Sequence, residues 1–306
     1  MVRVRVPATT ANLGSGYDCL GLALQLYNSV TLETSEHLEI EVFGQGEREL
    51  PRDEANLAYR AALAVYEALG AKAPALHLRL VNGVPLRRGL GSSASAVVGG
   101  LVAANALNGF PLPDQELLGL ACRLEGHPDN VCAAFCGGLV VSSWADGRVE
   151  YVRVPVAAGL RGVAFIPDFQ MPTDHARSLL PSTVSLGDAV FNIGRASLLV
   201  AAVSTGRFDL LGVATEDRLH QRYRRELFPS MDDFIAEARR AGAHGAFLSG
   251  AGSTILALTS GAERDVSEAL SRLAERRGIG GQVVIVELCD RGVAISASPV
   301  AASSCW

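Results

Sequence analysis

The chain has 306 residues, which is enough for one large domain or two of ordinary size. Apolar residues make up 49% of the chain and charged residues 19%, a composition typical of a globular protein with a large core and not of a disordered chain. The net charge of −5 at pH 7 gives no electrostatic reason to expect nucleic acid as a partner.

The start of the chain and its cysteines indicate a cytoplasmic protein. The first residues, MVRVRVPATT, alternate as a strand does and lack the apolar stretch of a signal peptide. The six cysteines are scattered, so we expect reduced thiols. Cys132 and Cys136 have the spacing of half a metal site, but no second pair of ligands follows, and no metal is expected there. No apolar run is expected to be long enough for a bilayer, so no membrane partner is expected.

In the first half of the chain, apolar periodicity predicts strands and helices that alternate irregularly. A polar loop is expected between the first two strands, at 7–16, and the turn Asp146-Gly147 is expected to join a pair of antiparallel strands. The predicted strands are 2–6, part of 17–30, 38–43, 76–81, 137–143 and 149–154, and the predicted helices are 56–69, 92–107 and 113–125.

A new pattern begins near Pro155, where we place a domain boundary between 1–155 and 156–306. Helices predominate in this second half, and the run 282–287 is expected to be the final strand. Irregular alternation in both halves favours an α+β fold over a doubly wound sheet. The predicted strands are 162–166, 246–249, 254–258 and 282–287, and the predicted helices are 173–180, 186–205, 208–214, 231–241 and 262–277.

The stretch PLRRGLGSSASA, 85–96, combines a glycine turn with the start of a helix. Gly89 and Gly91 allow a sharp turn because glycine tolerates positive φ. The free amides and the dipole at the start of the helix that follows bind phosphate without a lysine, and no lysine follows Gly91 here. The serine hydroxyls that come next can cap the helix, contact phosphate or bind Mg²⁺. Taken alone, the stretch is more simply explained as a glycine turn with a serine N-cap.

This stretch resembles the second motif of the GHMP kinases, P-x-x-x-G-L-G-S-S-A, at every fixed position. The family's first motif resembles VPATTANLGSGYDCLG near the start of the chain, and its third resembles GAFLSGAGSTILAL at 245–258. The three motifs stand in the family's order and cover most of the chain. The resemblance implies a ribosomal-protein-S5-like N-terminal ATP-binding domain, a ferredoxin-like C-terminal domain, an active site between them, and ATP and Mg²⁺ as cofactors.

Within the family, PATTANLGSGYD, LEGHPDNV and DHARSLLP resemble the branch that phosphorylates the side-chain hydroxyl of L-homoserine in threonine biosynthesis. Members of the family are often homodimers, and we expect one here. One alternative is a kinase of the same family with mevalonate or a sugar as acceptor. Another is a non-catalytic regulator on the same fold, which would be expected to lack the glycine loop, Glu125 or Asn130, and all of these are present.

On the donor side, the resemblance implies that Ser93 binds Mg²⁺ together with Glu125, with Ser92 as the second choice of serine. Asn56 resembles a position that lines the adenine pocket, although a helix N-cap explains it equally well. An exposed carboxylate at a helix end is the alternative for Glu125. The turn SGAGST at 249–254 is expected to support the loop. The predicted nucleotide-binding residues are Asn56, Pro85, Leu86, Arg87, Arg88, Gly89, Leu90, Gly91, Ser92, Ser93, Ala94 and Ser95.

The run GHPDN, 126–130, is a turn if it is taken alone. The resemblance implies that Asn130 orients the acceptor hydroxyl and that His127 contacts the substrate. Several relatives use an aspartate as a base in this region, so a base role for Asp129 stays open. An asparagine does not accept a proton near neutral pH, and with Asn130 at the hydroxyl, catalysis would depend on positioning and electrostatics.

For the acceptor, the resemblance implies Asp18 and Asn12 at the ammonium group and two arginines, Arg177 and Arg224, at the carboxylate. Arginine offers two parallel donors that match a carboxylate. Surface salt bridges are the alternative for both arginines. Thr173 lies one helical turn before Arg177, where its hydroxyl can reach the same site. At position 222 the family often has proline. Arg222 departs from this pattern, so the conformation of the local turn is not implied by the resemblance.

Overall fold

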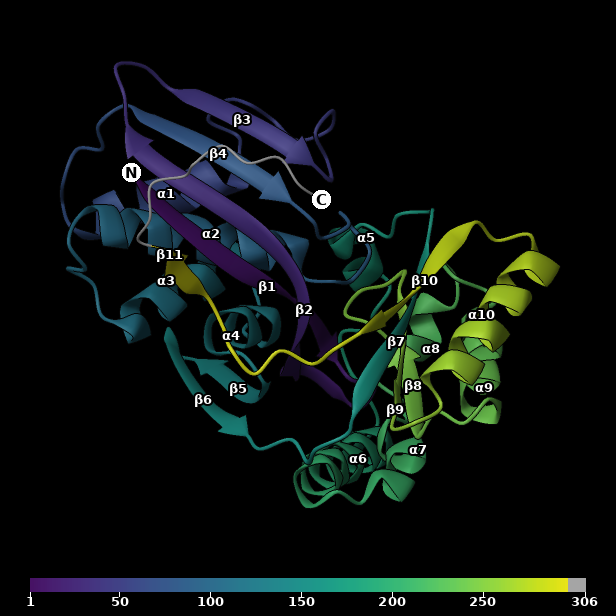
Figure 1. Cartoon of the computed structure of the whole chain (residues 1–306). Coiled ribbons are helices and arrows are strands. Elements are labelled where there is room, and N and C mark those ends of the chain that lie inside the picture. Colours follow the sequence, from purple (N-terminus) through teal and green to yellow (C-terminus); the bar gives the residue numbers. More distant parts are fainter. Residues whose placement is uncertain (297–306) are drawn as a thin grey trace.

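The structure is a computed structural model that describes residues 1–296; Cys305, one of the predicted thiols, lies outside this range. Two β-sheets with helices packed against them make up the described chain (Figure 1). The larger sheet has seven strands and the smaller has four. The predicted α+β class is therefore confirmed.

The larger sheet belongs mainly to the first half of the chain and has the order β11-β1-β2-β4-β3, with β5 paired to β2 and to β6. The predicted Asp146-Gly147 turn joins β5 to β6, and both of its residues have positive φ, 53° and 75°. The strands are β1 Val2–Asn12, β2 Gly16–Thr34, β3 Glu39–Gly44, β4 Leu76–Asn82, β5 Leu139–Ala145, β6 Arg148–Val154 and β11 Ala294–Ser296.

Strand β1 is longer than the sequence predicts, and the expectation of a loop at 7–16 is wrong. The strand continues to Asn12, paired with β2. Its register shifts between Pro7 and Ala8, a place where proline's missing N–H does not break the ladder. Only a tight turn at 13–15 separates β1 from β2. As a result, Thr9 lies under the glycine loop, where its N–H donates to the carbonyl of Leu90 (3.1 Å).

Four helices pack on the larger sheet: α1 Leu57–Ala68, α2 Ser92–Leu107, α3 Asp114–Glu125 and α4 Asp129–Cys136. Helix α2 runs through the core, and small residues allow close packing, since a Cβ on Gly100 would lie 2.2 Å from the carbonyl oxygen of Ala58. Helix α4 is not predicted from the sequence, which indicates only a break at His127-Pro128. Gly126 ends α3 with φ 83°, and Pro128 then starts a short helix whose run VCAAFC has no polar periodicity.

The smaller sheet has the order β10-β7-β9-β8 and carries α9 and α10 on one face (Figure 1). Phe165 of this sheet stacks on Phe234 with ring centroids 4.5 Å apart. The strands of the smaller sheet are β7 Arg161–Pro167, β8 Gly245–Leu248, β9 Ile255–Thr259 and β10 Gly281–Val286. The helices of this half of the chain are α5 Thr173–Ser178, α6 Leu186–Thr205, α7 Leu211–Ala214, α8 Gln221–Arg224, α9 Met231–Arg240 and α10 Glu263–Arg277, and a 3-10 turn, Phe208–Leu210, precedes α7. Of these helices, only α8 is not predicted.

The two halves share a core and a strand. One buried cluster joins Leu22 and Leu24 of the larger sheet to Ala164 and Leu256 of the smaller one. The expectation that 282–287 is the final strand is wrong, because β11 follows and pairs with β1. These contacts fix the relative placement of the two sheets and hence the shape of the cleft between them.

Helix α6 contradicts the expectation that no segment has the length and apolarity of a membrane span. The helix has 20 residues, and its most apolar stretch of 18 residues has a mean hydropathy of 1.4. One side of the helix is nevertheless fixed to the protein, because Asn192 donates to Ser15 and Asp217, and Asp188 pairs with Arg222. The opposite side leaves Leu186, Val190 and Ile193 exposed, so part of its apolarity lies on the surface.

Candidate active site

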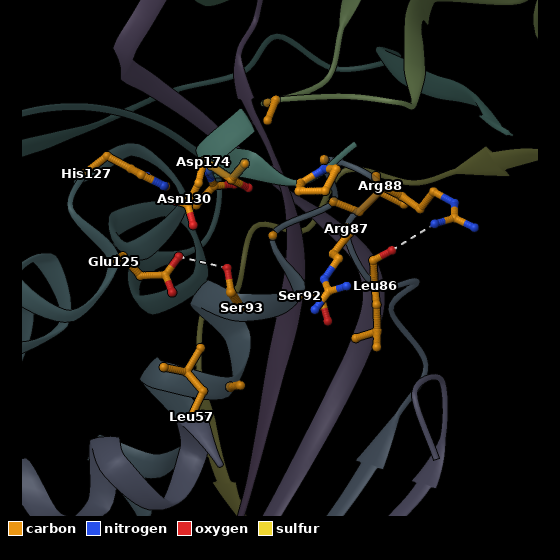
Figure 2. A pocket seen from close by; sticks show the side chains of 18 of the residues that line it. Leu57, Leu86, Arg87, Arg88, Ser92, Ser93, Glu125, His127, Asn130 and Asp174 are labelled. Atoms are coloured by element: carbon orange, nitrogen blue, oxygen red, sulfur yellow. Dashed lines mark hydrogen bonds between the residues drawn. The ribbon is translucent and has the colours of Figure 1, made fainter. Parts of the chain in front are cut away.

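A cavity of about 610 Å³ lies between the two halves (Figure 2). It collects residues from the larger sheet, from the turn between β8 and β9 of the smaller sheet, from the glycine loop, and from the starts of α1, α2, α4 and α5. Three predicted residues do not line it: Pro85, Ala94 and Ser95. The predicted residues that do are Asn12, Asp18, Asn56, Leu86, Arg87, Arg88, Gly89, Leu90, Gly91, Ser92, Ser93, Glu125, His127, Asp129, Asn130, Thr173, Arg177 and Arg224.

The glycine loop turns as the sequence predicts. Gly89 and Gly91 have φ of 72° and 68°, and Gly91 is the N-cap of α2 without a side-chain cap. The first amides of α2 therefore have no partner within the helix and face the cavity mouth. A Cβ on Gly91 would lie 1.9 Å from Oγ1 of Thr9, so only glycine brings the loop this close to β1. This geometry suits a phosphate group.

The turn SGAGST supports the loop from the other half of the chain. The hydroxyl of Ser249 donates to the carbonyl of Gly89 (2.6 Å), and the N–H of Thr254 donates to the carbonyl of Arg88 (3.1 Å). A Cβ on Gly89 would lie 2.0 Å from the carbonyl oxygen of Ser249. The loop is thus held in place by backbone contacts across the cleft.

The three serines of the loop point in different directions. The Ser95 side chain is fully buried, where its hydroxyl donates to the carbonyl of Ser92 and accepts from Asn28 (2.8 and 2.7 Å). Ser93 instead donates to Oε2 of Glu125 (2.9 Å; Figure 2). The predicted magnesium ligands Ser93 and Glu125 therefore lie side by side at the mouth of the cavity.

The environment of Glu125 fits a cation. Burial raises the pKa of its carboxyl group above the usual value, against the opposing effects of His127 and the hydrogen bond from Ser93. A carboxylate in this position gains from a bound cation because its own solvation is poor. Within residues 1–296 there is no group of three or more His, Cys, Asp or Glu side chains that could hold a metal. Two protein oxygens beside a phosphate site are a donor set typical of Mg²⁺ bound mainly through nucleotide and water.

Arg88 uses its guanidinium group to connect the loop to β7. It donates to the carbonyls of Leu86 and Pro167 (3.1 and 2.6 Å) and to that of Asp168. Its neighbour Arg87 has φ of 52°, and its guanidinium makes one long contact with Gln170 (3.4 Å). Of the two, Arg87 keeps more donors for a ligand.

Asn56 caps helix α1 while it lines the cavity. Its Oδ1 accepts from the amides of Ala58 and Tyr59 (3.0 and 3.3 Å), and its Nδ2 donates to the carbonyl of Pro51 (2.8 Å). The helix-cap interpretation of this residue is therefore present in the structure, and little hydrogen-bonding capacity remains for a nucleobase.

Asn130 is held between two side chains at the start of α4. Thr9 donates its hydroxyl to Oδ1 of Asn130 (2.8 Å), and Nδ2 of Asn130 contacts Oδ1 of Asp129 (3.3 Å). His127 shares the same aspartate oxygen through Nδ1 (2.7 Å). Although burial alone would raise it, the pKa of Asp129 is lowered by His127 and by the backbone amide of Asn130. Conversely, Asp129 raises the pKa of His127 against the effect of burial.

The predicted ammonium and carboxylate partners of the acceptor contact each other. Arg177 makes two parallel hydrogen bonds with Asp18, both 2.8 Å, and a third with the hydroxyl of Tyr17 (3.0 Å). Asn12 holds Asp18 from behind, because its Oδ1 accepts from the Asp18 amide (3.0 Å). This ion pair joins the start of β2, in the larger sheet, to α5 in the second half of the chain.

The second arginine, Arg224, is almost fully buried behind this pair. Its Nη1 donates to Nδ1 of His220 and to the carbonyl of Gly250, both at 2.8 Å. Arg222 turns away from the cavity and pairs with Asp188 of α6 (2.9 Å). Thr173 is the first residue of α5 and lines the cavity from an exposed position.

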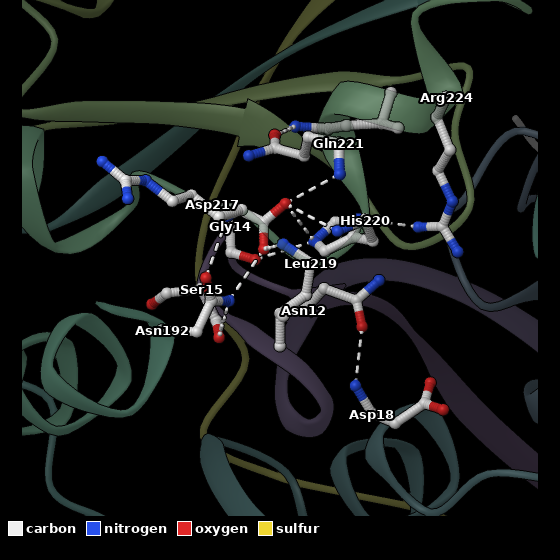
Figure 3. A network of polar contacts seen from close by, with 12 residues as sticks. Asn12, Gly14, Ser15, Asp18, Asn192, Asp217, Leu219, His220, Gln221 and Arg224 are labelled. Carbon is white, nitrogen blue, oxygen red and sulfur yellow. Dashed lines mark hydrogen bonds and ion pairs between the residues drawn. The ribbon is translucent and has the colours of Figure 1, made fainter. Parts of the chain in front are cut away.

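Several residues of the site are not predicted from the sequence. Asp174 is one that lines the cavity, and Thr9, Asp217 and His220 contact or support the residues that line it. Thr9 stands inside the first motif, so its position in PATTANLGSGYD is the signal that would have found it. Asp217 and His220 precede Arg224 in a segment without periodicity, and only the folded chain brings them to the first motif (Figure 3).

Comparison with known proteins agrees with the geometry of the cleft. The family model for the N-terminal domain of GHMP kinases matches residues 56–138, and the model for the C-terminal domain matches residues 199–276. The chain belongs to the GHMP kinase family. It is an ATP-dependent kinase with the two-part fold of that family.

Several relatives of this GHMP kinase carry the name homoserine kinase. Homoserine kinase of Moorella thermoacetica is 45% identical over 295 residues, which cover 96% of this chain and 100% of the relative. Homoserine kinase of Caldicellulosiruptor bescii is 47% identical over 258 residues, 84% of each chain. The crystal structure of homoserine kinase from Cytophaga hutchinsonii matches with a TM-score of 0.86 and 30% identity, over 96% of this chain and 97% of that one.

Proposed function

We propose that this kinase transfers the γ-phosphoryl group of ATP to the side-chain hydroxyl of L-homoserine and forms O-phospho-L-homoserine, a step of threonine biosynthesis. One observation carries the proposal: a carboxylate and two guanidinium groups, those of Asp18, Arg177 and Arg224, line the cavity that also contains Asn130. This set complements the ammonium and carboxylate groups of an amino acid. The names of the curated relatives support the same acceptor.

On the donor side, the amides at the start of α2 bind the phosphate groups of the nucleotide. Ser93 and Glu125 would hold Mg²⁺, which when bound neutralises charge on the phosphate oxygens. The two residues lie within hydrogen-bonding distance, which supports this role. Arg88 contributes by fixing the loop to β7, not by direct contact with phosphate, since carbonyl groups already occupy its donors.

Asn130 orients the acceptor hydroxyl. Its amide is held by Thr9 and Asp129, so the group has one orientation before substrate binds. Asp129 acts as the residue that orients His127 and Asn130, because its lowered pKa makes it a weak base near neutral pH. Catalysis then depends on positioning and on charge stabilisation around the transferred group.

The domain boundary at 155/156 is also a proposal. Strand β6 ends at Val154 and β7 begins at Arg161, and the two family models match on either side of this connection. Strand β11 belongs by sequence to the second domain and pairs with the first. A homodimer, a cytoplasmic location, and the absence of nucleic acid and membrane partners stay predictions.

A coupled assay of ADP release tests the acceptor. L-homoserine, L-serine, L-threonine, mevalonate and galactose are each supplied with MgATP, and a sample without acceptor serves as the blank. We expect the highest kcat/KM with L-homoserine. A higher kcat/KM with mevalonate or galactose would reject the proposed acceptor and leave the family assignment intact.

A further inference from the structure

His220 is a buried histidine behind the acceptor site, and it joins the first motif to Arg224 (Figure 3). Its Nε2 lies 2.7 Å from the carbonyl oxygen of Gly14, and its Nδ1 lies 2.8 Å from Nη1 of Arg224. No atom of its side chain reaches solvent. The imidazole ring therefore bridges the turn after β1 and the helix α8.

These two partners determine the protonation state of His220. A carbonyl oxygen only accepts, so Nε2 carries the hydrogen; a guanidinium group only donates, so Nδ1 is bare. Burial lowers the pKa of His220 to about 4; the nearby carboxylate of Asp217 opposes this shift, and the positive charge of Arg224 adds to it. At neutral pH the ring is uncharged and presents a hydrogen-bond acceptor to Arg224.

Asp217 keeps the segment around His220 in place. Its carboxylate accepts from the backbone amides of Leu219, His220 and Gln221 at 2.7 to 2.9 Å, and from Nδ2 of Asn192 on α6 (2.8 Å). This buried anion organises the turn before α8 through backbone contacts. His220 is thereby placed before any ligand arrives.

The contacts of Arg224 leave one end of its guanidinium group available. Nη1 has two hydrogens, and both are used, by His220 and by the carbonyl of Gly250. Nε makes a long contact with the carbonyl of Ala176 (3.5 Å). Within residues 1–296, no hydrogen bond from Nη2 to another residue is present. Arg224 lines the cavity, so the free end of the group is the one that can meet a ligand.

We propose that His220 is a positioning residue, which fixes the guanidinium group of Arg224 so that Nη2 faces the carboxylate of the acceptor. The inference rests on the proposed function. Preorganising Arg224 spares the substrate the entropy of ordering a long side chain. An acceptor without a carboxylate gains nothing from this arrangement, so His220 contributes to the choice of an amino acid over an amino alcohol.

Two substitutions separate the two hydrogen bonds of the ring. In His220→Gln the side-chain amide reaches the place of Nε2 and can donate to Gly14, but the acceptor for Arg224 is lost. In His220→Asn the amide oxygen stands near the place of Nδ1, and the acceptor for Arg224 is kept. For His220→Gln we expect the KM for L-homoserine to rise about 10-fold, as for loss of one hydrogen bond to a charged group. The KM for ATP should not change in either variant.

The decisive measurement is a ratio on one sample. The kcat/KM for L-homoserine is divided by that for 3-amino-1-propanol, which lacks only the carboxylate; if turnover is too slow, the inhibition constant of the amino alcohol replaces its kcat/KM. The fraction of folded enzyme cancels in this ratio when both acceptors are assayed as substrates. We expect the ratio to fall about 10-fold in His220→Gln and to persist in His220→Asn. His244→Gln makes the same substitution at a histidine that contacts Ser260 outside the cavity, and it should match the wild type.

An unchanged ratio in His220→Gln, or equal losses for both acceptors, would overturn the inference. If that variant does not fold, ¹⁵N-histidine NMR of the wild type decides. We expect the ring of His220 to carry hydrogen on Nε2 only, and its Nδ1 resonance should move with L-homoserine and not with 3-amino-1-propanol. A doubly protonated His220 ring at neutral pH, or no response of that ring to L-homoserine, would contradict the inference. A wild type that does not phosphorylate L-homoserine would instead reject the proposed function.

Discussion

The phosphate loop and the acceptor site face the same cavity, but the loop is one segment of the chain and the acceptor site is built from three. The loop, 85–96, is one continuous stretch that ends in helix α2, and two glycines with positive φ shape it. The acceptor site combines Asp18 from the start of β2, Arg177 from α5 and Arg224 from α8. The first is a local structure that distant backbone supports; the second exists only when three distant segments meet.

This difference predicts which property, nucleotide binding or acceptor binding, each substitution should change. A local structure made of backbone amides is sensitive to backbone conformation and insensitive to most side-chain changes. A site made of charged side chains from three segments is sensitive to each of those side chains, and each should change acceptor binding more than nucleotide binding. The predictions below test this division.

The largest effect is expected for Gly89→Ala. The new Cβ would lie 2.0 Å from the carbonyl oxygen of Ser249 and would require φ of 72°, so the loop must leave its position. We expect kcat/KM for both substrates to fall on the order of 100-fold or more, a loss typical of displaced phosphate-binding groups. Gly70→Ala is the control, because Gly70 has a similar φ of 63° with open space around it. It should lose about 1 kcal/mol of stability and no activity.

Asn130→Ala should lower kcat far more than it alters ATP affinity. Its amide is the oriented polar group of the acceptor side, held by Thr9 and Asp129, and its loss is expected to reduce kcat on the order of 100-fold. Steady-state kinetics with varied ATP separate the two effects. Asn105→Ala removes another buried helix asparagine, whose side chain bonds to the backbone of Leu112, and should reduce stability without this loss. An unchanged kcat in Asn130→Ala would reject its role.

Arg177→Lys should raise the KM for L-homoserine by about 10- to 100-fold, because lysine keeps the charge but cannot replace the two parallel hydrogen bonds. The KM for ATP should stay within about twofold if the division between the two sides holds. Arg207→Lys breaks a similar forked pair, with Asp209, on the surface outside the cavity, and should leave both values unchanged. Equal increases in both KM values would show that the two sides are not separate.

The smallest effect is expected in the magnesium requirement of Glu125→Gln. The MgCl₂ concentration for half-maximal activity should rise about 10-fold when one of two protein oxygens loses its charge. Because burial raises the pKa of Glu125, its carboxylate takes up a proton at higher pH than an ordinary glutamate, so the wild-type requirement should increase as the pH falls toward that pKa. The variant should lose this pH dependence. Glu116→Gln, on the exposed first turn of the same helix, is the control.

Sequence patterns predicted most of the elements but not their ends or the shortest helices. Helix α6 and the β5–β6 hairpin have the predicted limits within two residues, because long periodic runs and an Asp-Gly turn are strong local signals. Helix α4, eight residues long and without a polar side, has no such signal. Strand β1 extends through Pro7–Asn12 because its pairing with β2 outweighs the polar residues there.

For the candidate site, most of the residues predicted from the sequence line the cavity, but their contacts with one another were not predicted. Ser93 and Glu125 meet as the resemblance implies, whereas Ser95, three residues into the same helix turn, points into the core. Asp18 and Arg177 were expected to bind opposite ends of the substrate, and the structure pairs them with each other. Ser93 and Ser95 point in different directions because they lie two residues apart on a helix. Asp18 and Arg177 pair because folding brings the two halves of the chain together.

The sequence by itself determined the family, the α+β class and the lysine-free glycine loop, because these depend on motifs and on conformations that short stretches impose. Only the tertiary structure decided the acceptor site: the Asp18–Arg177 pair, the buried His220 against Arg224, and the return of β11 to β1. The physical reason is that opposite charges and buried hydrogen-bond partners are selected by proximity in space, and residues more than 150 positions apart, such as Asp18 and Arg177, come together only when both sheets have formed.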